Sequence, residues 1–256
     1  ALTRAVCSTI SYPLLTVSVA HLEGGVMNES EYVGLFERKL VHHCTPTLAG
    51  MKPANLFVCR DESVPGLGKS AAGAISPRAH ERNLTYALRI VREKLCPYGV
   101  HIELLARRKS GVLLYVYRPD MLRRDLARAD VARFLTEEGY DTGSLSACIG
   151  LLHDRIVGTD LQSTLSGSCA FPHEIGLFLG YPLDDVVGFI ENKGENYLCS
   201  GCWKVYSDER DAKECFCKYK ECTRAYEGLF DEGVPIECLA ALDDAYPAAE
   251  AFPQAS

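Results

Sequence analysis

The sequence predicts a single α+β domain in which helices cover a small, mainly antiparallel sheet. Apolar residues recur at helical spacing in several segments, for example between Leu84 and Leu95. Residues 100–104 alternate between apolar and polar, and a turn-like segment then leads into the apolar run 112–117, which is typical of a β-hairpin. With 256 residues, 47% of them hydrophobic, the chain is long enough to bury one full core.

The first helices are placed by their start and stop signals. Asn28, with Glu31 three residues later, predicts a capping box at the start of a helix that Pro46 is expected to stop. After a loop rich in glycine and proline, Ser76 and Pro77 are expected to supply the cap and the first residue of the next helix. Further helices are predicted around residues 120–126, 130–138 and 144–156.

The C-terminal half is predicted to contain a helical hairpin over residues 172–191. Gly176 would let its two helices approach closely, and Gly180 would form the turn between them. A short strand at 203–206 is expected to join the sheet, and Ser207 is expected to cap a long helix. The inward face of that helix would carry Ala212, Cys215, Phe216, Tyr219, Cys222 and Tyr226.

The predicted domain spans residues 27–242. An irregular extension at 1–26 is expected before it, and a disordered tail at 243–256 after it. The N-terminal apolar run up to Ala20 resembles a secretion signal only loosely, because serines, threonines and a proline interrupt it. We therefore expect a cytoplasmic protein whose cysteines are mostly reduced.

Charge and hydropathy argue against two classes of partner. A net charge of −7 and a pI near 5.6 do not suit a protein that binds the phosphates of nucleic acid. No apolar stretch approaches the roughly 18 residues that a membrane-spanning helix needs. Neither nucleic acid nor a membrane is expected as a partner, and a small molecule or another protein remains open.

A cluster of cysteines near the C-terminus is the most informative feature for function. Cys215 and Cys222 are expected on one helix, about 10.5 Å apart along its axis, which is too far for two ligands of one ion. At most one of these two thiols can therefore join Cys199 and Cys202. With Cys222 preferred over its alternative Cys215, the predicted metal ligands are Cys199, Cys202 and Cys222. The fourth ligand would come from elsewhere in the fold, with Cys44, His43, His173 and Cys148 as candidates. Zinc, an iron–sulfur cluster or a metal-containing cofactor such as haem are the candidate groups.

Two other functions compete with metal binding. A thiol-dependent enzyme would use either Cys44 or the pair Cys199 and Cys202, and for Cys44 the candidate base is His173, with Glu174 as a further carboxylate. The pair precedes a predicted strand, so it lacks the helix N-terminus that ordinarily lowers the pKa of such a thiol. The third possibility is a metal-free interaction module in which the cysteines pack as small apolar residues.

Three stretches of the sequence carry a resemblance to a known family. The stretches are HHCTPTLAGMKPANLF at 42–57, FPHEIGLFLGYP at 171–182 and CWKVY at 202–206. They resemble the family catalogued as domain of unknown function 3793, and the likeness covers roughly residues 30 to 230. The family has no assigned reaction, so the resemblance implies membership without implying an activity.

The function predicted from the sequence is therefore a cysteine- and histidine-rich cytoplasmic protein that binds a metal, a cluster or a metal-containing cofactor, with a redox role as one option. His43 and Lys52, which lie in the first of the three stretches, are the candidate cofactor-binding residues.

Overall fold

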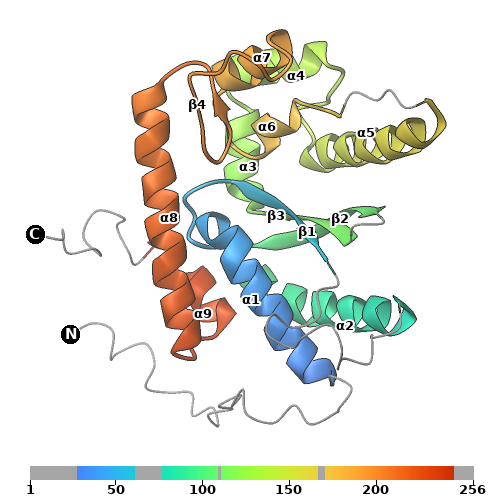
Figure 1. The fold of residues 1–256 in the computed structure, drawn as a ribbon, viewed down its shortest axis with the longest axis vertical. Helices are drawn as coiled ribbons and strands as arrows, with labels where there is room; N and C mark the ends of the chain where they lie inside the picture. The colour runs from blue at the N-terminus through green and yellow to red at the C-terminus, as the bar shows by residue number, and fades with distance from the viewer. Residues whose placement is uncertain (1–27, 61–76, 109–110, 167–170, 245–256) are drawn as a thin grey trace, which may run out of the picture.

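The protein has an α+β fold in which an antiparallel sheet lies between two layers of helices (Figure 1). The computed structural model describes residues 28–60, 77–108, 111–166 and 171–244. The sheet contains β1 (Ala54–Cys59), β2 (His101–Arg108) and β3 (Gly111–Tyr117), in the order β1-β3-β2. The predicted fold class and the predicted hairpin of β2 and β3 are confirmed.

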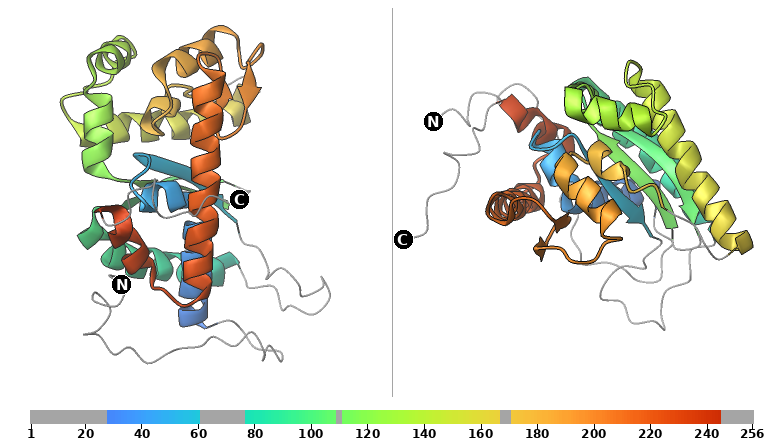
Figure 2. Two further views of the ribbon diagram at one scale, coloured as in Figure 1. Left: turned by 90° about the vertical axis from the view of Figure 1, so that its left-hand side faces the viewer. Right: turned by 90° about the horizontal axis from the view of Figure 1, so that it is seen from above.

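The helices of the two layers come from different parts of the chain (Figure 1). One face of the sheet is covered by α1 (Glu29–Leu48), α2 (Pro77–Leu95), α9 (Ile236–Ala240) and the short 3₁₀ turns η1 (Cys96–Tyr98) and η2 (Ala241–Asp244). The other face is covered by α3 (Pro119–Leu126), α4 (Ala129–Glu137), α5 (Leu145–Ser166), α6 (Ile175–Phe178) and α7 (Leu183–Glu191). The long helix α8 (Glu209–Asp231) runs past both layers (Figure 2, left).

Strand β3 separates two hydrophobic cores because successive side chains of a strand point to opposite faces. Val112, Leu114 and Val116 enter the core beneath α1 and α2, which we call the first core. The alternate side chains, Leu113, Tyr115 and Tyr117, enter the second core, beneath α3 to α7. A strand that is buried on both faces is expected to read as an almost unbroken apolar run, as this one does.

Helix α1 begins as predicted and ends later than predicted. Asn28 and Glu31 form the expected capping box, with both hydrogen bonds 2.9 Å long. Pro46 does not stop the helix, which continues to Leu48. Proline removes only one N–H from this last turn, and the carbonyls there find partners, since Pro46 O accepts from the backbone N–H of Met51 at 2.8 Å.

Arg118 satisfies most of the remaining carbonyls around this helix end. Its side chain is 7% exposed and donates to the carbonyls of Thr47 and Leu48 at 2.7 and 2.5 Å. It also reaches the carbonyls of Tyr98 and Ala240, each at 3.1 Å. One guanidinium therefore joins α1, η1 and α9 to the strand that Arg118 follows.

The C-terminal half differs from the prediction in two places. The predicted strand at 203–206 does not join the main sheet, and forms instead a separate two-stranded ladder of β4 (Cys199–Ser200) and β5 (Lys204–Val205). The second neighbour of β3, besides β2, is β1, a strand that was not predicted from the sequence. Ser207 does not cap α8, because Asp208 takes that position and accepts from the N–H of Asp211.

The helical hairpin predicted over 172–191 is present as α6 and α7, although α6 is a single turn. A Cβ at Gly176 would lie 2.7 Å from Val186 Cγ2, so only glycine allows this approach of the two helices. Gly180 has a φ of +75°, which favours glycine in the turn. Among the described residues no helix is long and apolar enough to cross a membrane. The predictions for residues 1–26 and for the tail from 245 onward lie outside the described residues.

Replacing Arg118 by methionine is expected to destabilise the fold strongly. Arg118→Met removes a donor from four buried or half-buried carbonyls, of which that of Thr47 keeps another donor, the N–H of Gly50 at 3.2 Å, so the free energy of unfolding should fall by about 3 kcal/mol or more. The measurement is urea denaturation followed by circular dichroism. Arg123→Met is the matched control, because Arg123 forms an exposed ion pair with Asp120 that contributes about 0.5 kcal/mol. Equal losses in the two variants would contradict the role given to Arg118.

Candidate functional site

Lys52 lies in the loop between α1 and β1, and this loop is fixed from several sides. The N–H of Lys52 donates to the carbonyl of Pro46 at 3.2 Å, and the carbonyl of Pro53 accepts from the backbone N–H of Arg118 at 2.8 Å. A Cβ at Gly180 would overlap the Pro53 ring, so the turn between α6 and α7 packs directly on the loop. The loop is thus held by residues of both helical layers.

The side chain of Lys52 is buried among aromatic rings and thiols. Lys52 is only 6% exposed, and its Nζ lies 5.1 Å from the centre of the Tyr181 ring and 5.8 Å from that of Tyr219. The groups whose charge acts on it are the thiols of Cys202, Cys44 and Cys215, in that order. No carboxylate is among these groups, although buried cations in proteins ordinarily have an anionic partner.

This environment changes the acid–base behaviour of Lys52 and of several groups around it. Burial lowers the pKa of Lys52 to about 8, because removing water disfavours the ammonium. Burial likewise raises the pKa of Tyr181 to about 12, and it raises the pKa of Cys44, Cys202 and Tyr219 above their ordinary values. For Cys202 the charge of Lys52 acts in the opposite direction, toward a lower pKa. The amine of Lys52 is therefore unusually easy to deprotonate, while the two thiols and two phenols with raised pKa values stay neutral at pH 7.

The walls of the site are joined by a continuous set of aromatic contacts. The Tyr181 ring stacks on Trp203 at 4.9 Å, and its hydroxyl donates to the carbonyl of Cys202 at 3.2 Å. Trp203 in turn meets Phe216 of α8 edge to face at 4.6 Å. A Cβ at Gly201 would overlap the Phe216 ring, so the turn between β4 and β5 lies against the helix. These contacts hold Cys202 close to Lys52.

Asp185, at the start of α7, anchors that turn. Its carboxylate is 2% exposed and accepts from the indole Nε1 of Trp203 at 2.6 Å. It also accepts from the N–H of Tyr206 at 2.7 Å and from both the N–H and the hydroxyl of Ser207 at 2.8 Å. A buried carboxylate with four donors is well satisfied, so the role of Asp185 is to position Trp203 and the residues before α8.

The predicted metal ligands are not assembled into a site. Cys199 acts electrostatically on Lys213, whereas Cys202 acts on Lys52, so the two thiols of the C-x-x-C have different neighbours. Cys222 is buried in the first core, and burial raises its pKa to about 11. Over the described parts of the chain, no three side chains of His, Cys, Asp or Glu are grouped as metal ligands. The thiols present therefore do not fit a zinc ion or a cluster in this arrangement.

The other candidate ligands and catalytic residues are dispersed. Cys148 lies in the second core, where its thiol donates to the carbonyl of Asp141 at 3.1 Å. His173 is exposed with its ring 4.9 Å from that of Phe189, and Glu174 is buried in an ion pair with Arg155. The described structure thus does not pair His173 or Glu174 with Cys44.

The candidate functional residues in the sequence stretch 42–57 divide into two groups. His43 is exposed and stacks on Phe57 at 4.9 Å, away from the buried amine. Cys44 is fully buried next to Lys52, and Lys52 is the centre of the site. Sequence reasoning had no role for Tyr181, Tyr219 or Asp185. The sequence pattern placed Asp185 on the outward face of its predicted helix, whereas the structure buries it.

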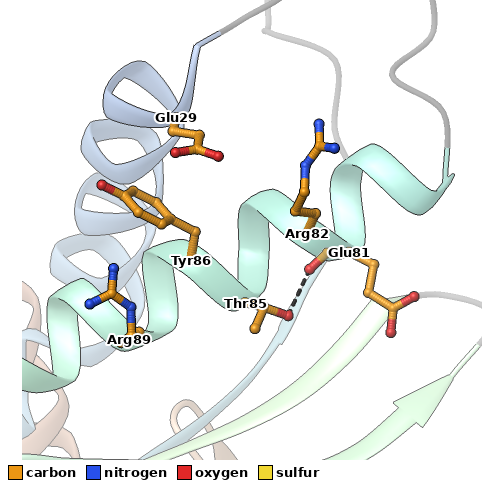
Figure 3. A pocket seen from close by; sticks show the side chains of 6 residues that line it. All are labelled: Glu29, Glu81, Arg82, Thr85, Tyr86 and Arg89. Atoms are coloured by element: carbon orange, nitrogen blue, oxygen red, sulfur yellow. Dashed lines mark hydrogen bonds between the residues drawn. The ribbon is translucent and has the colours of Figure 1, made fainter.

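A hollow of about 650 Å³ lies elsewhere, between the start of α1 and the exposed side of α2 (Figure 3). It is lined by Glu29, Glu81, Arg82, Thr85, Tyr86 and Arg89. Two of its charged groups are already paired, Arg89 with Glu93 at 3.2 Å and Glu81 with Arg107 at 3.0 Å. Its lining side chains are exposed or half-buried, so this hollow offers no desolvated reactive group and we assign the candidate site to Lys52.

Removing the anchoring charge should loosen the turn at Trp203. In Asp185→Asn the amide nitrogen replaces an accepting oxygen, so at least one buried donor loses its partner and stability should fall by about 2 kcal/mol. Trp203 is the one tryptophan of the chain, so its fluorescence emission should move to longer wavelength as the indole meets water. Asp184→Asn, at the exposed neighbouring position, is the control and should leave the emission unchanged. An unchanged spectrum in Asp185→Asn would contradict the anchoring role.

Replacing the buried amine by an apolar group should stabilise the protein at neutral pH. The unfolded chain holds the Lys52 proton up to about pH 10.5, and the folded chain releases it near pH 8. Lys52→Met should therefore gain about 3 kcal/mol at pH 7, and the gain should shrink as pH rises from 8 to 10.5. Thermal or urea denaturation at several pH values measures it. The control is Lys94→Met, which should destabilise the protein because Lys94 pairs with Glu37 at 2.7 Å.

Comparison with known proteins places the chain in a family. No curated protein and no solved structure matches it. A family model described as "Protein of unknown function (DUF3793)" matches residues 40–240, a span that includes β1 to β3, α2 to α9, the C-terminal part of α1 and every residue of the Lys52 site. The match covers well over half of the chain and agrees with the resemblance of the three sequence stretches. The chain belongs to the DUF3793 family of proteins of unknown function.

Proposed function

We propose that this protein is an enzyme that acts on a small carbonyl compound through the amine of Lys52, with Cys202 as the neighbouring thiol. One observation carries the proposal: Lys52 is buried against two aromatic rings and three thiols, with no carboxylate among the groups that act on its charge. A buried lysine of this kind is the usual source of a nucleophilic amine in proteins. The proposal keeps the thiol-dependent alternative of the sequence analysis and makes the amine its principal reactive group.

The chemistry follows from the neutral form of the amine. With a pKa of about 8, roughly one Lys52 in ten is neutral at pH 7, against fewer than about one in a thousand for an ordinary exposed lysine. The Nζ lone pair attacks the carbonyl carbon, the carbonyl oxygen takes up protons, and loss of one water gives a protonated imine. The thiol of Cys202 can donate and recover a proton in these steps, because it lies next to the amine and is exposed on its outer side.

The aromatic rings suit the cation that this reaction forms. The faces of Tyr181 and Tyr219 lie 5.1 and 5.8 Å from Nζ, within the range in which an aromatic ring attracts a cation. A protonated imine would keep its positive charge at the same place, so the rings would stabilise it there. No carboxylate is among the groups that act on the charge of Lys52. A carboxylate there would pair with the ammonium and raise the pKa of the free amine.

The alternatives have less support from the geometry. Metal binding through Cys199, Cys202 and Cys222 stays a prediction, and the positions of these thiols would have to change for one ion to contact all three. Cys44 as a nucleophile would need access and a base, and it is fully buried. An interaction module would use exposed apolar residues such as Tyr197 at 42% and Leu198 at 56%, yet scattered exposed apolar residues are ordinary on protein surfaces.

Reductive trapping tests the proposal directly. The protein is incubated with acetaldehyde, pyruvate or benzaldehyde and sodium cyanoborohydride, and the modified lysine is located by peptide mass mapping. We expect Lys52 to be modified, with a rate that rises through pH 8, whereas exposed lysines should respond only toward pH 10.4. Lys52→Met should lose the early phase and keep the late one.

The control for loss of fold is the stability of the same variant. Because Lys52→Met is expected to be more stable than the parent protein, loss of trapping in it cannot be attributed to unfolding. Cys202→Ser should slow trapping without changing the site of modification. If Lys52 were modified with the same pH dependence as the exposed lysines, the proposal would be contradicted.

A further inference from the structure

The turn between β4 and β5 brings a second reactive pair together at the same place. Cys202 and Cys215 act on each other electrostatically, and both act on Lys52. The residues on either side of Cys202 contact the residue that follows Cys215: Gly201 lies against Phe216, and the Trp203 ring is 4.6 Å from it. The thiol of Cys215 lies within hydrogen-bonding reach of Tyr219, which itself lies over Lys52. The two cysteines thus belong to one cluster although 12 residues lie between them.

The thiol of Cys199 points to a different neighbourhood. Its charge acts on Lys213, and Lys213 is two residues before Cys215 on α8, about 200° around the helix. Cys202 therefore lies near the side of α8 that faces Lys52, and Cys199 lies near the side that carries Lys213. The spacing C-x-x-C suggests a pair in the sequence, but the strand β4 and the turn after it separate the two thiols in the fold.

We propose that Cys202 and Cys215 form an oxidisable dithiol that reduces a hydroperoxide, closing a disulfide between the β4–β5 turn and α8. A disulfide needs Cα atoms within roughly 7 Å, and the contacts of Gly201 and Trp203 with the Phe216 ring place the β4–β5 turn against α8 next to Cys215. Both thiols are partly accessible, Cys202 exposed and Cys215 half-buried, whereas Cys44 is sealed in the core. Access selects the first two for a small oxidant.

The reaction is balanced with hydrogen peroxide as the oxidant. The sulfur of Cys202, as thiolate, attacks one oxygen, the O–O bond breaks, and hydroxide leaves and takes up the proton that the thiol released, giving water and a sulfenic acid. The sulfur of Cys215 then attacks the Cys202 sulfur and displaces its hydroxyl group, which leaves as a second water. Two thiols lose two electrons in total, and the peroxide gains them. Burial raises the pKa of Cys202, and the charge of Lys52 acts in the opposite direction, toward the attacking thiolate.

The dithiol also offers control over the site of the proposed function. This control of the Lys52 site rests on the proposed function, whereas formation of the disulfide itself does not. A covalent link between the β4–β5 turn and α8 would hold Cys202 in place over Lys52, whose side chain is only 6% exposed. We expect reductive trapping of a carbonyl compound at Lys52 to be slower in the oxidised protein and to recover after reduction.

The test is oxidation of the full chain followed by mapping of the links. The reduced protein is treated with one equivalent of hydrogen peroxide, remaining thiols are alkylated, and peptides are analysed by mass spectrometry without reduction. We expect a peptide that joins Cys202 to Cys215, absent in Cys202→Ser and in Cys215→Ser. Cys217→Ser is the matched control, because Cys217 is exposed on the same helix two residues further on, and this variant should keep the link.

Each other outcome overturns the proposal. A link between Cys199 and Cys202, a link that persists in Cys215→Ser, or full alkylation of both thiols in protein with native Trp203 emission would each do so. Tryptophan emission shows whether the serine variants keep the packing of the turn. A disulfide without any imine at Lys52 would overturn the proposed function alone, and an imine without the disulfide would overturn this inference alone.

Discussion

The guanidinium of Arg118 is the contact on which the rest of the structure depends. It donates to the carbonyls of Thr47 and Leu48 at the end of α1, and with the same group it holds η1 and α9. Its backbone N–H fixes Pro53, so the loop that carries Lys52 is held at the helix end and at the strand start by one residue. Helix, sheet and candidate site therefore share a common support. Arg118 is also the last residue before α3, the first helix of the second layer.

Two buried cations in this protein are treated in opposite ways. Arg118 is surrounded by carbonyl acceptors, which makes its burial favourable, whereas Lys52 meets rings and neutral thiols. The first arrangement stabilises the fold and the second works against it. Proteins retain an unfavourable buried charge mainly where reactivity or binding requires it, which is why the Lys52 site supports a functional proposal more strongly than the cysteine spacing does.

Much of the fold follows from local signals, and the rest depends on contacts between distant residues. The capping box at Asn28, the inward stripe of α2 and the β2–β3 hairpin were predictable because each is written in neighbouring residues. Strand β1 was not, because a short apolar run after a helix has no period that identifies it. The helix spacing correctly separated Cys215 from Cys222, but no spacing rule indicates that Lys52 is buried, since lysine is ordinarily exposed.

Helix α8 has a consequence for the order in which the molecule folds. The site is built from a loop near residue 52, a turn near 202 and a helix near 215, which lie far apart in the chain. Bringing such distant segments together requires closing long loops, so these contacts form after the local helices and the β2–β3 hairpin. The burial of Lys52 depends on Cys215 and Tyr219 of α8, which lie far along the chain from residue 52. We therefore expect the amine to be buried only after these long loops close, so that its altered reactivity belongs to the completed fold.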